Sequence, residues 1–158
     1  MRKQKNHLTN DFLIKIGKAI KTICVEYEAV FIINDDVDLA LKVNADGVHL
    51  GKNDCSYKDA RMLLGHNKLI GVSCYNSVDR AISAAENGAD YIALGSFFRS
   101  PTKVNAPLCS TETLSEAETK VEIPIVAIGG VSEKNGRSLI ENGANLLACI
   151  SSIFKNDK

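Results

Sequence analysis

The feature that most constrains this chain is a regular alternation of short apolar runs with amphipathic helical patterns. Apolar runs of four or five residues occur at 29–33, 47–50, 69–72, 91–94, 125–128 and 146–150. Between them lie helical patterns such as 78–86 and 133–141, in which apolar residues recur at helical spacing. This alternation predicts six parallel strands joined by crossover helices.

The opening stretch 11–25 also has a helical pattern. Its apolar residues fall on one face and its lysines on another: Phe12, Ile16, Ile20 and Ile23 against Lys15, Lys18 and Lys21. The chain is therefore expected to begin with an amphipathic helix ahead of its first apolar run.

A short tripeptide recurs at 44–46, 88–90 and 143–145, as Asn-Ala-Asp, Gly-Ala-Asp and Gly-Ala-Asn. Each copy ends a predicted helix and precedes an apolar run, so the repeat is expected to mark every second strand. An open doubly wound sheet and a closed (β/α)₈ barrel both fit this order. The sequence contains neither G-x-G-x-x-G nor G-x-x-x-x-G-K-[ST], and polar residues or glycines end every predicted strand, which favours the barrel.

Length and composition limit the number of domains, the expected partners and the location of the protein. A chain of 158 residues with 45% hydrophobic content fits one domain, 1–158, with a real core. Nineteen basic residues balance 19 acidic ones, so nucleic acid or an anionic membrane is not an expected partner. The polar start is not a signal peptide and no apolar run could span a bilayer, which predicts a cytoplasmic protein. Five scattered cysteines without a C-x-x-C pair are interpreted as core or strand-end thiols.

Two segments have the composition of anion-binding loops. The last two predicted strands end in Gly129-Gly130 and in Ile150-Ser151, where backbone N–H groups can approach a phosphate closely. The alternative for the glycine pair is a tight turn that needs positive φ. Residues 100–103, Ser-Pro-Thr-Lys, combine two hydroxyls and an ammonium group, although an ordinary solvated loop has the same composition.

Acidic residues follow the first two predicted strands. Asp35 and Asp54 would lie on one rim if these strands are adjacent, and carboxylates beside a diphosphate suit Mg²⁺. We nominate only these two as metal ligands, because Asp36 and Asp38 suit the N-terminus of the next helix. His49 stands alone in a strand and is interpreted as structural. With no paired nucleophile and base in the sequence, the residues favour a reaction driven by charge stabilisation.

Together these motifs resemble the thiamine phosphate synthase family. The similarity runs from about residue 11 to 154, and its segments are Ile-Asn-Asp at 33–35, Ala-Asp-Gly-Val-His-Leu-Gly at 45–51, Gly-Val-Ser at 71–73, Gly-Ala-Asp-Tyr at 88–91, Ser-Pro-Thr-Lys at 100–103 and Val-Ala-Ile-Gly-Gly at 126–130. The resemblance implies a transferase with a TIM-type (β/α)₈ barrel. Its reaction condenses hydroxymethylpyrimidine diphosphate with thiazole phosphate, giving thiamine phosphate and diphosphate.

The resemblance also implies roles for individual residues. Asn34, Ser73 and Lys103 would hold the pyrimidine diphosphate, with Asp35 and Asp54 on Mg²⁺. The thiazole phosphate would be held by Ser100, Thr102, Gly129, Gly130, Ile150 and Ser151. Two departures are Ser100, where the family commonly has Thr, and Cys109, where it commonly has Gly.

A third departure concerns the start of the chain. Family members begin with a strand, a helix and a second strand that ends in Q-x-R-x-K, and Arg2, Lys3 and Lys5 are candidates for its basic positions. We therefore expect a barrel lacking its first strand and helix and most or all of its second strand. Such open edges favour association, homo-oligomers included, and predict weak or no activity for the isolated chain.

Two other interpretations stay open. A thiazole tautomerase shares the fold and the thiazole phosphate site, although Asn34, Asp35, Asp54 and Lys103 speak against it. A non-catalytic remnant would keep the phosphate pocket and bind without turnover.

Overall fold

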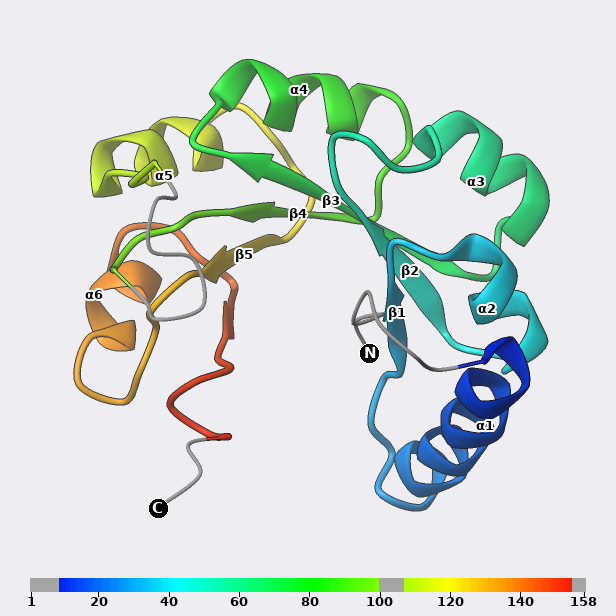
Figure 1. The fold of residues 1–158 in the computed structure, drawn as a ribbon. Coiled ribbons are helices and arrows are strands. Elements are labelled where there is room, and N and C mark those ends of the chain that lie inside the picture. The colour runs from blue at the N-terminus through cyan, green and yellow to red at the C-terminus, as the bar shows by residue number, and fades with distance from the viewer. Residues whose placement is uncertain (1–8, 100–106, 155–158) are drawn as a thin grey trace. The chain divides into compact units, whose positions relative to one another are not determined.

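The computed structural model describes residues 9–99 and 107–154 and contains six parallel strands in chain order (Figure 1). The chain divides into two compact units, Met1–Val72 and Ser73–Lys158. In the described residues no helix is both long and apolar enough to cross a membrane. The expected α/β class with parallel strands is confirmed, while the single domain stays a prediction.

The first unit alternates helices and strands. Its elements are α1 (Asn10–Glu26), β1 (Ile32–Asn34), α2 (Val37–Lys42), β2 (Gly47–Leu50), α3 (Tyr57–Leu64) and the first part of β3 (Leu69–Tyr75). β1 pairs with β2 in parallel and β2 pairs with β3, with Asn34 opposite His49 and Leu50 opposite Val72. This register places the carboxyl ends of β1 and β2 side by side.

The second unit repeats the pattern. It contains the end of β3, then α4 (Val78–Glu86), β4 (Tyr91–Leu94), α5 (Thr111–Glu118), β5 (Ile125–Ile128), α6 (Gly136–Glu141) and β6 (Leu146–Ala148). β5 pairs in parallel with both β4 and β6, with Leu94 opposite Ala127 and Ile128 opposite Ala148. The loops that follow β4 and β5 therefore leave the same edge of this sheet.

Three strands have the bounds that the sequence predicts and three differ, since β3 also continues past residue 72 to Tyr75. The first strand begins at Ile32 instead of residue 29, because the N–H of Ala29 donates to the carbonyl of Cys24 and ends α1. The last ends at Ala148 instead of residue 150, since the carbonyl of Ile150 accepts the N–H of Phe154 and forms a turn. In both cases a local hydrogen bond competes with strand pairing.

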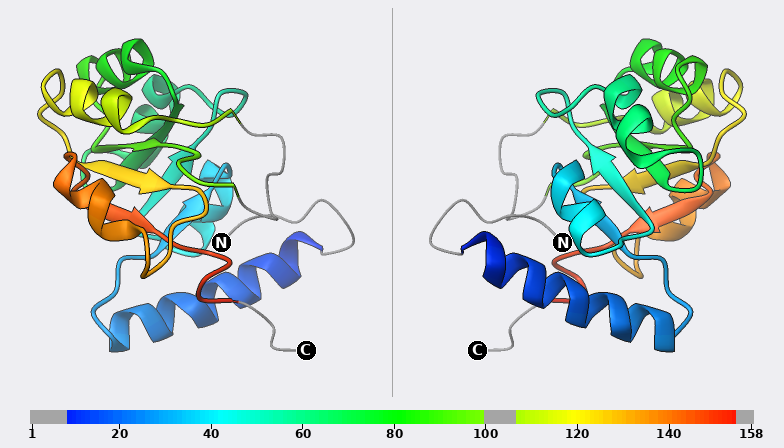
Figure 2. Two further views of the ribbon diagram at one scale, coloured as in Figure 1. Left: turned by 90° about the vertical axis from the view of Figure 1, so that its left-hand side faces the viewer. Right: turned by 90° about the vertical axis from the view of Figure 1, so that its right-hand side faces the viewer.

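The predicted helix at 11–25 is confirmed as α1, but its apolar face is only partly buried. Leu13 and Gly17 are buried, whereas Phe12 is 46% and Ile23 is 55% exposed. Gly17 allows close packing, because a Cβ at this position would lie 2.7 Å from Cγ1 of Val43. Figure 2 shows α1 (blue) from two sides, with the loop that leads from its carboxyl end into β1.

The recurring tripeptides close their helices in one way. At the end of α2, Asn44 has φ +51°, its N–H donates to Leu41 and the N–H of Ala45 donates to Ala40. This pair of bonds is a Schellman motif, which satisfies carbonyls that a helix end leaves unpaired. The same two bonds end α4 at Gly88 and Ala89 and α6 at Gly143 and Ala144. The repeat precedes β2, β4 and β6, as predicted for every second strand.

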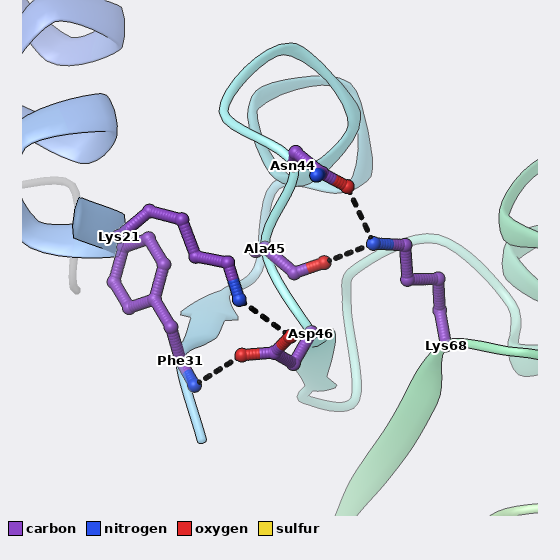
Figure 3. A network of polar contacts seen from close by, with 6 residues as sticks. All are labelled: Lys21, Phe31, Asn44, Ala45, Asp46 and Lys68. Carbon is purple, nitrogen blue, oxygen red and sulfur yellow. Dashed lines mark hydrogen bonds and ion pairs between the residues drawn. The ribbon is translucent and has the colours of Figure 1, made fainter. Parts of the chain in front are cut away.

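The residue that follows the first repeat's alanine, Asp46, joins three elements of the first unit (Figure 3). Its N–H donates to the carbonyl of Phe31 at 2.9 Å, and its Oδ2 accepts the N–H of Phe31 at 2.8 Å. Nζ of Lys21, on α1, lies 2.6 Å from Asp46 Oδ1. Burial tends to raise the pKa of Asp46, but these hydrogen bonds and the charges of Lys21 and Lys68 together hold it below its ordinary value.

The last repeat builds an equivalent contact in the second unit without a charge. The N–H of Asn145 donates to the carbonyl of Ile125 at 2.9 Å, and Asn145 Oδ1 accepts the N–H of Ile125 at 2.7 Å. In the first unit, Nζ of Lys68 adds bonds to Asn44 Oδ1 and to the carbonyl of Ala45, each 2.7 Å long. The repeat thus fixes one strand to the start of its neighbour in both units.

Candidate active site

The carboxyl end of β1 has an uncommon backbone geometry at Asp35. The N–H of Asp36 donates to the carbonyl of Asn34 at 2.9 Å, and Asp35, between them, has φ +67°. This is a γ-turn of the rare positive-φ form, in a region that side-chain-bearing residues seldom occupy. The N–H of Asp35 holds the turn to β2 by donating to the carbonyl of His49 at 2.9 Å. Uncommon backbone conformations of this kind cluster at functional sites.

The neighbouring aspartates have different tasks. Asp36 is the N-cap of α2, where its Oδ1 accepts the N–H of Leu39 at 2.9 Å, and Asp38 lies in the first turn. This confirms the sequence-based assignment of both residues to the helix N-terminus. Asp35 is exposed at the strand end.

An open pocket of about 340 Å³ lies at this end of the first unit. It is lined by Asn34, Asp35, Asp36, Val37, Asp38, Cys55 and Leu63. The structure therefore brings Asn34 and Asp35 together, as the sequence predicted for neighbouring residues of one strand end. Three of the pocket's lining residues are aspartates, although more of its lining surface is apolar than polar.

Asp54 follows β2 and is half-buried. Its Oδ2 accepts the N–H of Gly51 at 2.7 Å, which fixes the orientation of the carboxylate. Asp54 is not among the residues that line the pocket, although its neighbour Cys55 is. Among the described residues no group of three or more His, Cys, Asp or Glu side chains is arranged to hold a metal ion. A cation here would need further oxygen ligands, which a bound diphosphate has.

In the second unit, the glycine pair after β5 packs closely on the loop after β4. Gly129 and Gly130 have φ +100° and +67°. A Cβ on Gly129 would lie 1.8 Å from Oγ of Ser96, and one on Gly130 would lie 2.7 Å from the Phe98 carbonyl oxygen. The tight-turn interpretation therefore accounts for why both positions are glycine. It does not exclude an anion site, because the same geometry exposes backbone.

The carbonyl groups of this loop are all engaged. Those of Ile128 and Gly129 accept the N–H groups of Phe97 and Phe98, at 3.2 and 2.9 Å. The carbonyl of Gly130 accepts a hydrogen bond from Nδ2 of Asn135 at 3.1 Å. The carbonyl of Val131 accepts one from the hydroxyl of Ser152 at 2.9 Å.

By contrast, in the part of the chain that the structure describes, the N–H groups of Gly130 and Val131 have no protein acceptor. A loop whose carbonyls already accept hydrogen bonds, and whose N–H groups have no protein acceptor, presents more unused donors than acceptors. Such a loop favours an anion over a cation.

Asn135 and Ser152 are residues that sequence reasoning missed. Asn135 also accepts the N–H of Ser132 through Oδ1 at 2.8 Å, so its amide closes the loop from both sides. The sequence signal is weak, since Ser152 only follows the last apolar run and Asn135 only falls within the predicted helix 133–141. Ile150 and Ser151, which were predicted to hold the anion, lie in the turn just before Ser152, with Ile150 56% exposed and Ser151 half-buried.

The remaining predicted site residues divide into two groups. Ser73 lies in β3 and is half-buried, and its carbonyl accepts a bond from Arg80. Ser100, Thr102 and Lys103 lie outside the described residues, as do the basic residues at positions 2, 3 and 5.

Parallel strands in chain order, helices between them and functional loops at strand carboxyl ends define an α/β protein of the (β/α) barrel class. A family model described as thiamine monophosphate synthase matches residues 2–153. The chain therefore belongs to the thiamine monophosphate synthase family.

Similar proteins agree with this assignment. The thiamine-phosphate synthase of Acidithiobacillus ferrooxidans is 48% identical over 136 residues, covering 86% of this chain and 63% of the relative. That of Nitrosospira multiformis is 44% identical over 138 residues, covering 87% and 59%. The chain thus spans about three fifths of the length of these relatives.

Solved structures support the fold. Thiamine phosphate pyrophosphorylase from Pyrococcus furiosus superposes with a TM-score of 0.88 at 36% identity, covering 99% of this chain and 74% of that one. A 3-hexulose-6-phosphate synthase reaches 0.68 at 17% identity, which shows the shared fold alone.

Proposed function

We propose that this chain acts as a thiamine phosphate synthase, joining hydroxymethylpyrimidine diphosphate to thiazole phosphate. The observation that carries the proposal is the loop at Gly130 and Val131, whose N–H groups have no acceptor among the described residues and so suit a phosphate group, in a chain of this family. The similar proteins whose names state this activity are 42–48% identical to it.

The first unit would serve the diphosphate substrate. Asn34 would bind the pyrimidine, and Asp35 and Asp54 would hold Mg²⁺. Carboxylate oxygens suit this ion, and the fixed carboxylate of Asp54 and the exposed one of Asp35 follow paired strands. Bound Mg²⁺ would neutralise charge that builds on the leaving diphosphate. Ser73 and Lys103 would complete the contacts to this substrate.

The second unit would serve the thiazole phosphate. The N–H groups of the glycine loop would donate to its phosphate oxygens, and Ser151 would add a hydroxyl. Gly129, Ile150, Ser100 and Thr102 would belong to the same site. Asn135 and Ser152 would keep the loop's carbonyls turned away from the anion.

The chemistry requires no general acid or base to begin. The bond between the pyrimidine methylene carbon and the diphosphate oxygen breaks, and its electron pair leaves with diphosphate. The lone pair of the thiazole nitrogen then forms the new C–N bond, so atoms and charge balance. Fixed donors and cations that stabilise the departing charge would supply the rate enhancement.

Steady-state assays of the 158-residue chain with both substrates and Mg²⁺ test this proposal. We expect thiamine phosphate to form, and Asp35→Asn to reduce its rate of formation by about a hundredfold. Asp11→Asn, at an exposed carboxylate in the first turn of α1, should leave the rate unchanged and serves as the control.

Binding measurements separate the alternatives. In an amide chemical-shift titration with inorganic phosphate, the N–H signals of Gly130 and Val131 should move most. Phosphate binding without product would favour the non-catalytic binder. If calorimetry shows no binding of either substrate and no product forms, both readings are wrong.

A further inference from the structure

The unusual arginine of the second unit is Arg80, the third residue of α4. Its N–H donates to the N-cap hydroxyl of Ser77 at 3.3 Å, so its backbone is fixed in the first helical turn. The side chain points back toward the strand just completed. There, Nη2 donates to the carbonyl of Ser73 at 3.2 Å.

The same guanidinium group also contacts the turn that ends β3. Its central carbon lies 5.5 Å from the centroid of the Tyr75 ring, within the range of a cation–π interaction. Tyr75 has φ +58°, and its carbonyl accepts the N–H of Gly95 at 2.8 Å. Arg80 therefore contacts both Ser73 and Tyr75, the two residues that flank Cys74 at the end of β3.

The charge of Arg80 is not neutralised by a carboxylate in the described part of the chain. Its Nε is buried and has no hydrogen-bond partner there. The neighbouring thiol of Cys74 does not compensate, because burial raises its pKa to about 11, although the Arg80 charge acts in the opposite direction. A buried donor without an acceptor opposes stability, so this side chain is poorly suited to a purely structural role.

We propose that Arg80 is a positioning residue that holds Ser73 for the diphosphate-bearing substrate and adds uncompensated positive charge beside it. This inference rests on the proposed function, because Ser73 is there assigned to the pyrimidine diphosphate. Arg80 acts through the backbone of Ser73 and through its charge, which strengthens the attraction for an anion at the end of β3. The thiazole phosphate, assigned to the glycine loop, should gain little from it.

Calorimetry on the intact chain with Mg²⁺ tests the proposal. Arg80→Met should weaken binding of the pyrimidine diphosphate by about tenfold, while binding of thiazole phosphate changes less than about twofold. Arg80→Lys retains the charge but not the planar group, so it should recover part of the loss. Arg137→Met, at an 89% exposed arginine of the same unit, should change neither affinity.

The outcomes are distinct. Equal weakening of both substrates by Arg80→Met, together with a lower melting temperature and no recovery in Arg80→Lys, would show a structural role and overturn the proposal. Unchanged affinities in Arg80→Met would overturn it too, while leaving the proposed function intact. If the unsubstituted chain binds neither substrate, the proposed function fails and this inference fails with it.

Discussion

At the amino ends of β2 and β6 the same hydrogen-bonded contact is made by two different side chains. In the first unit, Asp46 exchanges two hydrogen bonds with Phe31, and in the second unit Asn145 does the same with Ile125. Both side chains supply an oxygen at the same place in the repeat. Only the first carries a charge, and only there does a lysine lie within 2.6 Å.

The difference shows which part of this contact both units share and which part is specific to the first unit. An amide oxygen is enough to accept a strand N–H, as Asn145 demonstrates. The carboxylate of Asp46 does more, because it also binds Lys21 and so attaches α1. A neutral acceptor is thus sufficient for the strand, and the charge serves the attached helix.

The largest effect is expected for Asp46→Ala. This change leaves the N–H of Phe31 without its acceptor and Lys21, whose side chain is 19% exposed, without its partner. We expect a loss of about 2–3 kcal/mol in the free energy of unfolding, measured by urea denaturation. Asp79→Ala, an exposed carboxylate in the first turn of α4, is the control and should lose less than about 0.5 kcal/mol. Equal losses in the two variants would contradict this view of Asp46.

Asn145→Ala should have a smaller effect in the same experiment. It removes the acceptor of the Ile125 N–H but leaves no charged group without a partner. We expect a loss of about 1 kcal/mol, the usual value for one neutral hydrogen bond. A loss as large as that of Asp46→Ala would mean that the charge in the first unit contributes nothing.

The pH dependence of stability isolates that charge. Because the folded protein holds the pKa of Asp46 below 3.8, its value in a model peptide, the unfolded chain binds the proton more readily. The stabilisation is fully present above the unfolded pKa and is lost as pH falls through the folded pKa. Asp46→Asn has no such group, so its deficit relative to the unsubstituted chain should be constant above about pH 5 and shrink below about pH 4. Urea denaturation at a series of pH values measures it, and a constant deficit down to pH 3 would count against the charged contact.

The smallest effect concerns the helix ends. In the first unit, α1 ends with Glu28 at φ +52°, whereas α4 and α6 of the second unit end with Gly88 and Gly143 at this left-handed position. Glu28→Gly should therefore stabilise the protein by about 0.5 kcal/mol, visible as a small rise in melting temperature. Gly88→Ala is the matched opposite, since an added Cβ would meet open space and only the backbone conformation opposes it. A melting temperature that falls in Glu28→Gly would show that the glutamate side chain makes a contribution of its own.

The sequence predicted the six parallel strands and the bounds of three of them, because apolar runs and helix-ending tripeptides are local signals. The acidic strand end at Asn34 and Asp35 was equally visible, since both residues are adjacent in the chain. The contact that closes the glycine loop could not be predicted from the sequence, because Ser152 and Val131 are 21 residues apart and only the fold brings them together.

The residues that α1 buries could not be predicted from its pattern, for a related reason. Apolar periodicity identifies a hydrophobic face but not which face a neighbouring element covers. Here Gly17, which has no side chain to signal burial, packs against Val43, and Lys21 on the same face contributes a buried stem and a charged tip.

The small buried area of α1 has a consequence for local opening of the protein. This helix of 17 residues buries only Leu13 and Gly17 and adds one ion pair. Segments with so little burial open at a lower free energy than buried strands do. Its amide protons should consequently exchange with solvent deuterium sooner than those of β2, and sooner still in concentrated salt, which screens the lysine from its carboxylate.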